Sequence, residues 1–98
     1  METIKLLPST NKLKKWMIKY QGRTIHFGQK GYLDQTLGAT KKQKELYIKR
    51  HRQRENWNDP TTAGFWSKHL LWNLPSLARS ISYTNRAFGK VYGFKIVK

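Results

Sequence analysis

The chain has 98 residues, which is enough for one domain with a modest core, and its 20 Lys and Arg outnumber its 5 Asp and Glu to give a formal net charge of +15. The excess positive charges repel one another unless an anionic partner screens them. The usual partners are nucleic acid, an anionic membrane surface or an acidic protein. The 13% aromatic content argues against a disordered basic tail, and the lack of cysteine excludes disulfides, cysteine nucleophiles and zinc fingers.

Residues 1–12 are predicted to form an extended arm before a single domain over residues 13–98. The string PSTN at residues 8–11 interrupts the arm, so we expect poor order or a peripheral strand there. The N-terminus lacks the apolar run and small-residue cleavage site of a secretory signal. No apolar run in the chain approaches the ~18–20 residues of a membrane span. We therefore expect a protein that is not secreted and has no transmembrane segment.

The stretch KLKKWMIKYQGRTIHFG predicts a β-hairpin over residues 13–28. Gln21-Gly22 forms its two-residue turn, in which the glycine supplies a positive φ. The register that follows from this turn pairs Tyr20 with Arg23, Lys19 with Thr24, Ile18 with Ile25, Met17 with His26 and Trp16 with Phe27. The large apolar side chains of both strands then fall on one face. A single register that sorts both strands in this way favours the hairpin.

A glycine-containing loop over residues 28–40 leads into the most basic segment of the chain. Thr40 and Gln43 fit a capping box, which predicts a helix from there to about Asn56. This helix carries seven cations, namely Lys41, Lys42, Lys44, Lys49, Arg50, Arg52 and Arg54. Glu45 is the only acid among them, so intrahelical salt bridges cannot relieve their mutual repulsion. The pattern favours a face that binds phosphates over the alternative of a solvated helix surface.

Two more helices are predicted downstream of the basic one. Asp59 can cap the first and Pro60 suits its first position, and the following string TTAGFWSKHLLWN is the most apolar helical pattern of the chain. Ser76 caps the next helix, over residues 76–88, and Gly89 is predicted to end it.

The tail KVYGFKIVK alternates apolar and polar residues, which predicts a strand over residues 90–97 that pairs with the hairpin. The predicted fold class is therefore α+β, with a small antiparallel sheet, made of the N-terminal hairpin and the C-terminal strand, packed on three short helices. The predicted core consists of Trp16, Ile18, Ile25, Phe27, Ile48, Phe65, Trp66, Leu70, Leu77, Ile81, Phe94 and Ile96.

The nearest approach to a catalytic pair is His51 with Glu55, four residues apart on one helix face. Together with either of the other two histidines they could hold a divalent metal, as a nuclease requires. No two carboxylates are spaced for two-metal catalysis, so we expect no catalytic residue, no metal, no cofactor and no small-molecule substrate. Tyr32 and Trp57 stand beside predicted loops and are candidates for stacking on unpaired bases, with a core position as the alternative.

The strings IHFGQKGYLDQT, YIKRHRQRENW and TTAGFWSKHLLWNLPSLARSI resemble a family of short basic proteins of nucleocytoplasmic large DNA viruses, a family of unknown function. The resemblance covers residues 16–82. The third string often carries an aromatic residue where this chain has His69, which implies a packing role for that histidine. The resemblance implies no particular activity. It implies a viral setting, in which a basic protein could neutralise packaged DNA or lie among the minor proteins of a capsid.

Three functions remain open. The leading hypothesis is a non-catalytic basic protein that binds nucleic acid, above all DNA, through backbone phosphates with little sequence specificity. The alternative is a minor structural, capsid-associated virion protein that binds acidic protein surfaces. The lesser alternative is a small metal-dependent nuclease that uses His51 and Glu55. In each case we expect the protein in a virion or in the cytoplasm or nucleus of the host cell.

Overall fold

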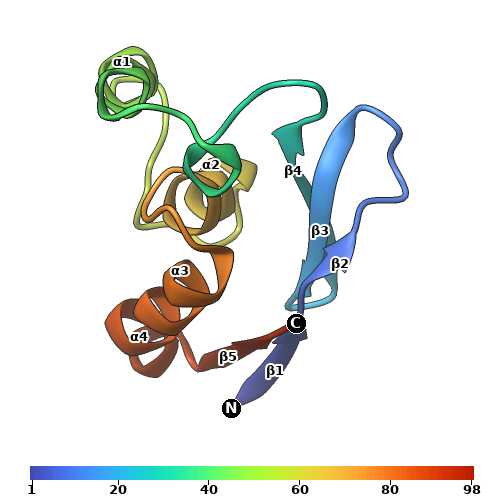
Figure 1. Cartoon of the computed structure of the whole chain (residues 1–98). Helices are drawn as coiled ribbons and strands as arrows, with labels where there is room; N and C mark the ends of the chain where they lie inside the picture. The colour runs from blue at the N-terminus through green and yellow to red at the C-terminus, as the bar shows by residue number, and fades with distance from the viewer.

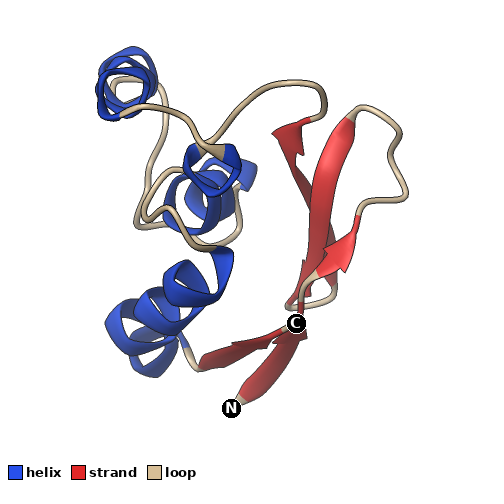
Figure 2. Cartoon of the chain, viewed as in Figure 1, coloured by secondary structure: helices blue, strands red, loops and turns tan.

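The computed structural model describes all of residues 1–98 and confirms the α+β class (Figure 1). The elements in chain order are β1 (Glu2–Lys5), β2 (Leu7–Pro8), β3 (Lys14–Tyr20), β4 (Arg23–Gln29), the 3-10 turn η1 (Gln35–Leu37), α1 (Lys41–His51), α2 (Ala63–Trp66), η2 (Ser67–Leu71), α3 (Leu77–Thr84), η3 (Asn85–Gly89), α4 (Lys90–Tyr92) and β5 (Phe94–Val97). α2 runs directly into η2, and α3 runs through η3 into α4, so the helical layer has three stretches. Figure 2 shows the helices gathered on one side and the strands on the other.

The predicted hairpin is confirmed in its turn and in its register. Gln21 and Gly22 both have positive φ, 50° and 79°, which is the geometry that matches the twist of the flanking strands. β3 and β4 pair antiparallel as Tyr20 with Arg23, Lys19 with Thr24, Ile18 with Ile25, Met17 with His26 and Trp16 with Phe27. The shared apolar face is buried at Ile18, Ile25 and Phe27. β2 adds a third antiparallel strand beside β3.

The structure corrects the pairing of the C-terminal strand. β5 pairs with β1 in a two-stranded parallel sheet rather than with the hairpin. Ile4 and Ile96 stand opposite each other in this sheet, and both are buried. The first residues, which were predicted as an arm, are therefore extended and also place Ile4 and Leu6 in the core. The parallel pairing joins the two ends of the chain, and no local pattern encodes such a contact.

A side chain closes the outer edge of β5. The Asn85 side-chain amide donates from Nδ2 to the carbonyl oxygen of Ile96 at 3.0 Å, and Ile96 N donates to Asn85 Oδ1 at 2.7 Å. Asn85 thus supplies the donor and acceptor that a further strand would supply. An edge protected in this way does not pair readily with another chain.

The two predicted helix caps at Thr40 and Ser76 are confirmed. The Thr40 hydroxyl accepts from Gln43 N at 3.1 Å while Thr40 N donates to Gln43 Oε1 at 2.7 Å, a complete capping box. Ser76 Oγ accepts from Arg79 N at 3.3 Å. α1, however, ends at His51 instead of Asn56. Beyond Ile48 it has no apolar side chain to hold another turn against the core.

The other two predicted helix boundaries are wrong. Thr62, not Asp59, is the N-cap of α2, since its hydroxyl accepts from Phe65 N at 3.3 Å. The last helical stretch passes through Gly89 and ends at Tyr92. Its C-cap is Gly93, whose φ of 73° is the left-handed geometry that favours glycine. Gly89 has a different role, because a Cβ there would lie 2.6 Å from the carbonyl oxygen of Phe94.

The core joins both sheets to the α2–η2 helix. Its buried apolar residues are Ile4, Leu6, Ile18, Tyr20, Ile25, Phe27, Phe65, Trp66, Leu70, Leu71, Phe94 and Ile96. The predicted core residues Trp16, Leu77 and Ile81 are partly buried against this cluster, whereas Ile48 lies outside it. Tyr47 takes the place of Ile48 as the buried residue of α1. None of the helices has the length and apolar character needed to cross a bilayer.

Candidate functional site

The predicted phosphate-binding residues lie on α1 and on the turn that follows it. All of them except Lys44 are exposed, and α1 stands at the outer corner of the helical layer, away from the sheets (Figure 1). Lys44 is half-buried because its ammonium donates to the carbonyl oxygen of Asn73 at 2.7 Å. The chain has only two ion pairs, Lys15–Asp34 and His51–Glu55. None of the seven cations therefore has an acidic partner.

A stack of aromatic rings attaches α1 to the rest of the molecule. Tyr47 lies parallel to Trp72, with ring centroids 4.6 Å apart, and the ring of His51 also stacks on Tyr47 at 4.4 Å. The Tyr47 hydroxyl donates to Ser67 Oγ at 3.3 Å. Burial raises the pKa of Tyr47 to about 12, although the hydrogen bond to Ser67 acts in the opposite direction and Glu55 adds to the rise. Tyr47 is therefore a neutral structural anchor.

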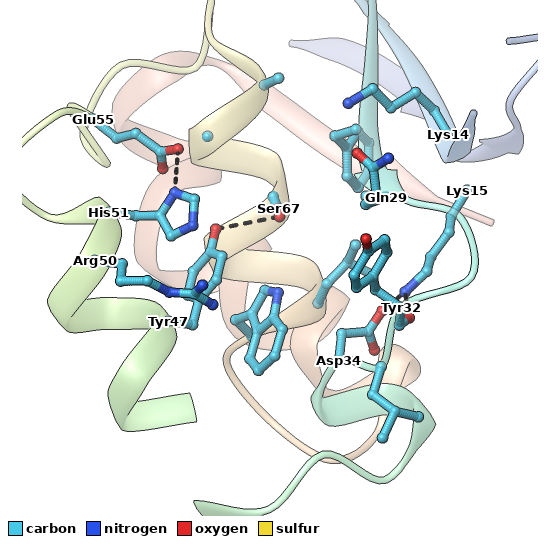
Figure 3. A pocket seen from close by; sticks show the side chains of 17 residues that line it. Lys14, Lys15, Gln29, Tyr32, Asp34, Tyr47, Arg50, His51, Glu55 and Ser67 are labelled. Carbon is cyan, nitrogen blue, oxygen red and sulfur yellow. Dashed lines mark hydrogen bonds and ion pairs between the residues drawn. The ribbon is translucent and has the colours of Figure 1, made fainter. Parts of the chain in front are cut away.

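A cleft of about 440 Å³ opens between α1, the end of β4 with the loop that follows it, and the α2–η2 helix (Figure 3). Its lining residues are Lys14, Lys15, Phe27, Gly28, Gln29, Tyr32, Leu33, Asp34, Tyr47, Arg50, His51, Glu55, Ala63, Gly64, Ser67, Leu71 and Trp72. All of them except Lys14 and Lys15 belong to the three strings that carry the family resemblance. These strings are distant in sequence, and the fold brings them to one place.

One wall of the cleft is built around the Glu55 carboxylate. Oε1 accepts from His51 Nδ1 at 3.0 Å, and Oε2 accepts from Trp57 Nε1 at 2.8 Å. Gly64 makes this arrangement possible, because a Cβ at that position would lie 2.6 Å from Glu55 Oε2. The carboxylate thereby fixes the orientation of the imidazole, and His51 Nε2 has no hydrogen-bond partner in the protein.

The opposite wall is a loop held by a buried ion pair. The Lys15 ammonium lies 2.7 Å from Asp34 Oδ2 and also donates to the carbonyl oxygen of Tyr32 at 2.5 Å. The Asp34 carboxylate is completed by Thr36, whose backbone N and hydroxyl both donate to Oδ1. Asp34 is 1% exposed, whereas Tyr32 is 66% exposed. The loop is therefore fixed from within and presents Tyr32 outward.

The two candidates for base stacking have different surroundings. Tyr32 lines the cleft. Trp57 lies outside it and is half-buried, with Tyr47 at 6.4 Å and the Lys68 ammonium 5.5 Å above its ring. Trp57 also accepts from His69 Nε2 through its carbonyl oxygen at 2.8 Å. Through these contacts Trp57 fixes the segment that follows α1. Of the two candidates for base stacking, Tyr32 is therefore the one with an accessible ring.

The structure does not bring a third ligand to His51 and Glu55. His26 bonds Ser9 Oγ at 2.7 Å, and His69 packs between Phe65 and Phe88. No group of three or more His, Asp or Glu residues is placed to hold a metal ion. His69 therefore has the packing role that the resemblance implied.

Several residues that line the cleft could not be predicted from the sequence. Lys14 and Gln29 lie on neighbouring strands of the hairpin, and Ser67 and Trp72 belong to a helix that was expected only to fill the core. One signal was present: between Ile48 and Trp57 the basic segment has no apolar side chain, so one side of this helix must face solvent or a partner. The pattern could not show that a cleft forms beside it.

Comparison with known proteins adds one result. A sequence model described as a family of unknown function (DUF5754) matches residues 4–51, just under half of the chain. The match runs from β1 to the end of α1, so it includes Tyr32 and Arg50 and stops before Glu55. Over this part the chain is similar to an uncharacterised family. No curated protein and no solved structure matches the chain.

Proposed function

We propose that this protein is a non-catalytic nucleic-acid-binding protein that holds the phosphate backbone of DNA with little sequence preference. The observation that supports this proposal is the set of α1 cations that are exposed and lack acidic partners, in a chain of net charge +15. Even Glu45, the one acid of α1, forms no ion pair. Such a face repels itself in isolation, and phosphates relieve this repulsion while they release their own counterions.

The position of α1 suits a large polyanion. The helix lies at the periphery (Figure 1), so a nucleic acid can approach its outer side without meeting the sheets. Its cations are lysines and arginines on flexible stems, and charge contacts of this kind fix a protein on the backbone without reading bases. Binding by this face is therefore expected to depend on salt far more than on sequence.

Two charge-matched variants test the proposal. The first replaces Lys42 and Lys49 of α1 and Arg52, its C-cap, by alanine. The second replaces the exposed strand residues Lys5, Lys19 and Lys95 by alanine. Affinity for a short DNA duplex is measured at low salt by fluorescence anisotropy. The α1 variant should lose roughly tenfold or more in affinity while the strand variant loses clearly less. Equal losses, or no binding of the unaltered protein at low salt, would contradict the proposal.

The alternatives appear as other outcomes of the same measurement. A capsid-associated protein that binds acidic protein surfaces would bind polyglutamate as well as it binds DNA. A metal-dependent nuclease would shorten the DNA when Mg²⁺ is present, and His51→Ala would abolish the cleavage. The nuclease has the least support, because only His51 and Glu55 come together.

A further inference from the structure

The cleft between α1 and the loop after β4 differs from the outer face of α1, because it is concave and aromatic as well as cationic. We propose that it binds one unpaired nucleotide of a nucleic-acid chain, with the phosphate held by Arg50 and Lys14 and the base against Tyr32. This inference rests on the proposed function and deepens it, since it names the form of nucleic acid that the protein prefers.

The charge of the cleft favours a phosphate. Both of its acids are used inside the protein: Asp34 is bonded by Lys15 and Thr36, and Glu55 is bonded by His51 and Trp57. Arg50 and Lys14 have no acidic partner. Figure 3 shows these two residues on opposite walls, Arg50 with α1 and Lys14 beside Gln29. An anion between the walls would meet donors from both sides.

The ring of Tyr32 favours a base. It lies on the wall opposite α1 in Figure 3 and is the most exposed of the aromatic residues that line the cleft. The ammonium of Lys15 donates to the carbonyl oxygen of Tyr32 and holds the backbone of that residue in place. The loop therefore loses little conformational entropy when a base stacks on the Tyr32 ring. The side chain of Gln29 stands between Lys14 and Tyr32 in the same view and offers a donor and an acceptor to a base edge.

The size and shape of the cleft favour an unpaired nucleotide over a duplex. Its volume of about 440 Å³ lies within the range of roughly 300–1,000 Å³ that small-ligand pockets occupy. A paired base is stacked on both sides within the helix, and it has to be unpaired or turned out before a concave pocket can receive it. A single strand or an unpaired end meets this condition without that cost.

Two matched pairs of variants separate the cleft from the general cationic surface. Tyr32→Leu removes the exposed ring of the cleft, and Tyr83→Leu removes an exposed tyrosine of α3 that lies outside it. Arg50→Ala removes the cleft cation of α1, and Arg52→Ala removes an exposed cation that does not line the cleft. Thermal unfolding of each variant checks that the fold is retained.

Affinities are measured for a single strand of about 12 nucleotides, for a duplex with the same number of phosphates, and for the same strand with abasic sites. The unaltered protein should prefer the single strand. Tyr32→Leu should weaken single-strand binding roughly tenfold and leave duplex and abasic binding unchanged, and Tyr83→Leu should change none of them. Arg50→Ala should weaken single-strand binding more than Arg52→Ala does. A free nucleoside monophosphate should compete only weakly, because it lacks the phosphates that α1 contacts.

The outcomes distinguish the two proposals. If DNA is not bound even at low salt, the proposed function fails and the inference falls with it. If DNA is bound but single strand and duplex bind equally, and Tyr32→Leu behaves like Tyr83→Leu, the backbone-binding function stands and the cleft proposal is overturned. Tight binding of the free nucleotide, with strand affinity independent of Tyr32, would also overturn it.

Discussion

At the scale of single residues, Lys15 and Asp34 are the pair on which the cleft wall depends. The carboxylate is almost fully buried, and Lys15 is the only cation that neutralises it. Lys15→Met should therefore leave a buried charge without a partner and lower the free energy of unfolding by about 3–5 kcal/mol. For a domain of this length that is a fall in Tm of about 12 °C or more.

The neighbouring Lys14 provides the control for this prediction. It is half-buried and has no acidic partner, so Lys14→Met should change the free energy of unfolding by no more than about 0.5 kcal/mol. Thermal unfolding followed by circular dichroism compares the two variants. Similar Tm values for Lys15→Met and Lys14→Met would show that the buried pair does not hold the loop.

His69 makes stability depend on pH. Burial lowers its pKa, an effect that the nearby Lys68 adds to and that the hydrogen bond to the Trp57 carbonyl opposes. The unfolded chain, with a histidine pKa of about 6.5, therefore binds a proton at a higher pH than the folded protein does. The free energy of unfolding is unaffected by His69 above that value and falls as the pH drops from it toward the lower folded pKa.

Urea unfolding at pH of about 7.5 and about 5.5 measures this effect. Stability should fall between the two values in the unaltered protein and in His26→Gln, whose ring is only half-buried. His69→Phe, which keeps an aromatic ring between Phe65 and Phe88, should lose much less stability over the same interval. An unchanged pH dependence in His69→Phe would assign the effect to other groups.

At the scale of elements, α1 is attached by one buried side chain. Tyr47→Ala should cost about 3–5 kcal/mol and release α1 in particular, because it removes the ring that stacks on Trp72. Tyr47→Phe should cost only about 1 kcal/mol, the worth of the hydroxyl's bond to Ser67. In Tyr47→Ala, hydrogen exchange should show that the backbone amides of α1 lose protection while those of β3 and β4 keep theirs. The neighbouring exposed residue gives the control, since Leu46→Ala should leave that protection unchanged.

β5 depends on Asn85 at its outer edge. Asn85→Ala leaves the amide and carbonyl of Ile96 without their partners, which should lower stability by about 1–3 kcal/mol and open the edge to pairing with a second chain. Sedimentation and thermal unfolding measure the two effects. Asn58→Ala, at an exposed asparagine, is the control. A variant at Asn85 that is as stable as the unaltered protein would mean that solvent replaces the amide at no cost.

The elements that sequence reasoning predicted well are those whose determinants are local. The hairpin register follows from the turn at Gln21-Gly22 and from alternation within one short stretch. The caps at Thr40 and Ser76 act within three residues of their own positions. The parallel pairing of β1 with β5 was missed because its determinants lie at opposite ends of the chain. The C-cap at Gly93 was missed because the sequence predicts the end of the helix at Gly89. A glycine is needed at position 89 for a different reason, since β5 packs too closely there for a Cβ, and the sequence does not show this contact.

One part of the candidate site could be predicted from the sequence and the other part could not. The exposed cations of α1 could be predicted, because a lysine or arginine without an acid nearby faces solvent by default. The cleft could not, because it needs the loop after β4, the end of α1 and the α2–η2 helix to meet. Arg50 and Arg52 look equivalent in sequence, and only the fold shows that one of them lines the cleft.

At the scale of the whole molecule, the net charge of +15 acts against the compact state. Raising the salt concentration from about 20 to about 300 mM shortens the Debye length and should raise Tm. DNA at constant ionic strength should raise it further, because a ligand that binds the folded state stabilises it. Differential scanning calorimetry compares the two. If salt raises Tm and DNA does not, folded-state binding to DNA is contradicted.

The most direct test of the central claim is the dependence of DNA affinity on salt. Binding of a duplex and of polyglutamate is measured between about 50 and about 200 mM salt, for the unaltered protein and for the variant that lacks Lys42, Lys49 and Arg52. The account predicts tighter binding of DNA than of polyglutamate, a steep fall in affinity with salt, and a shallower slope, by about two to three units, in the variant. Equal, weak binding of both polymers with the same slope in both proteins would contradict it.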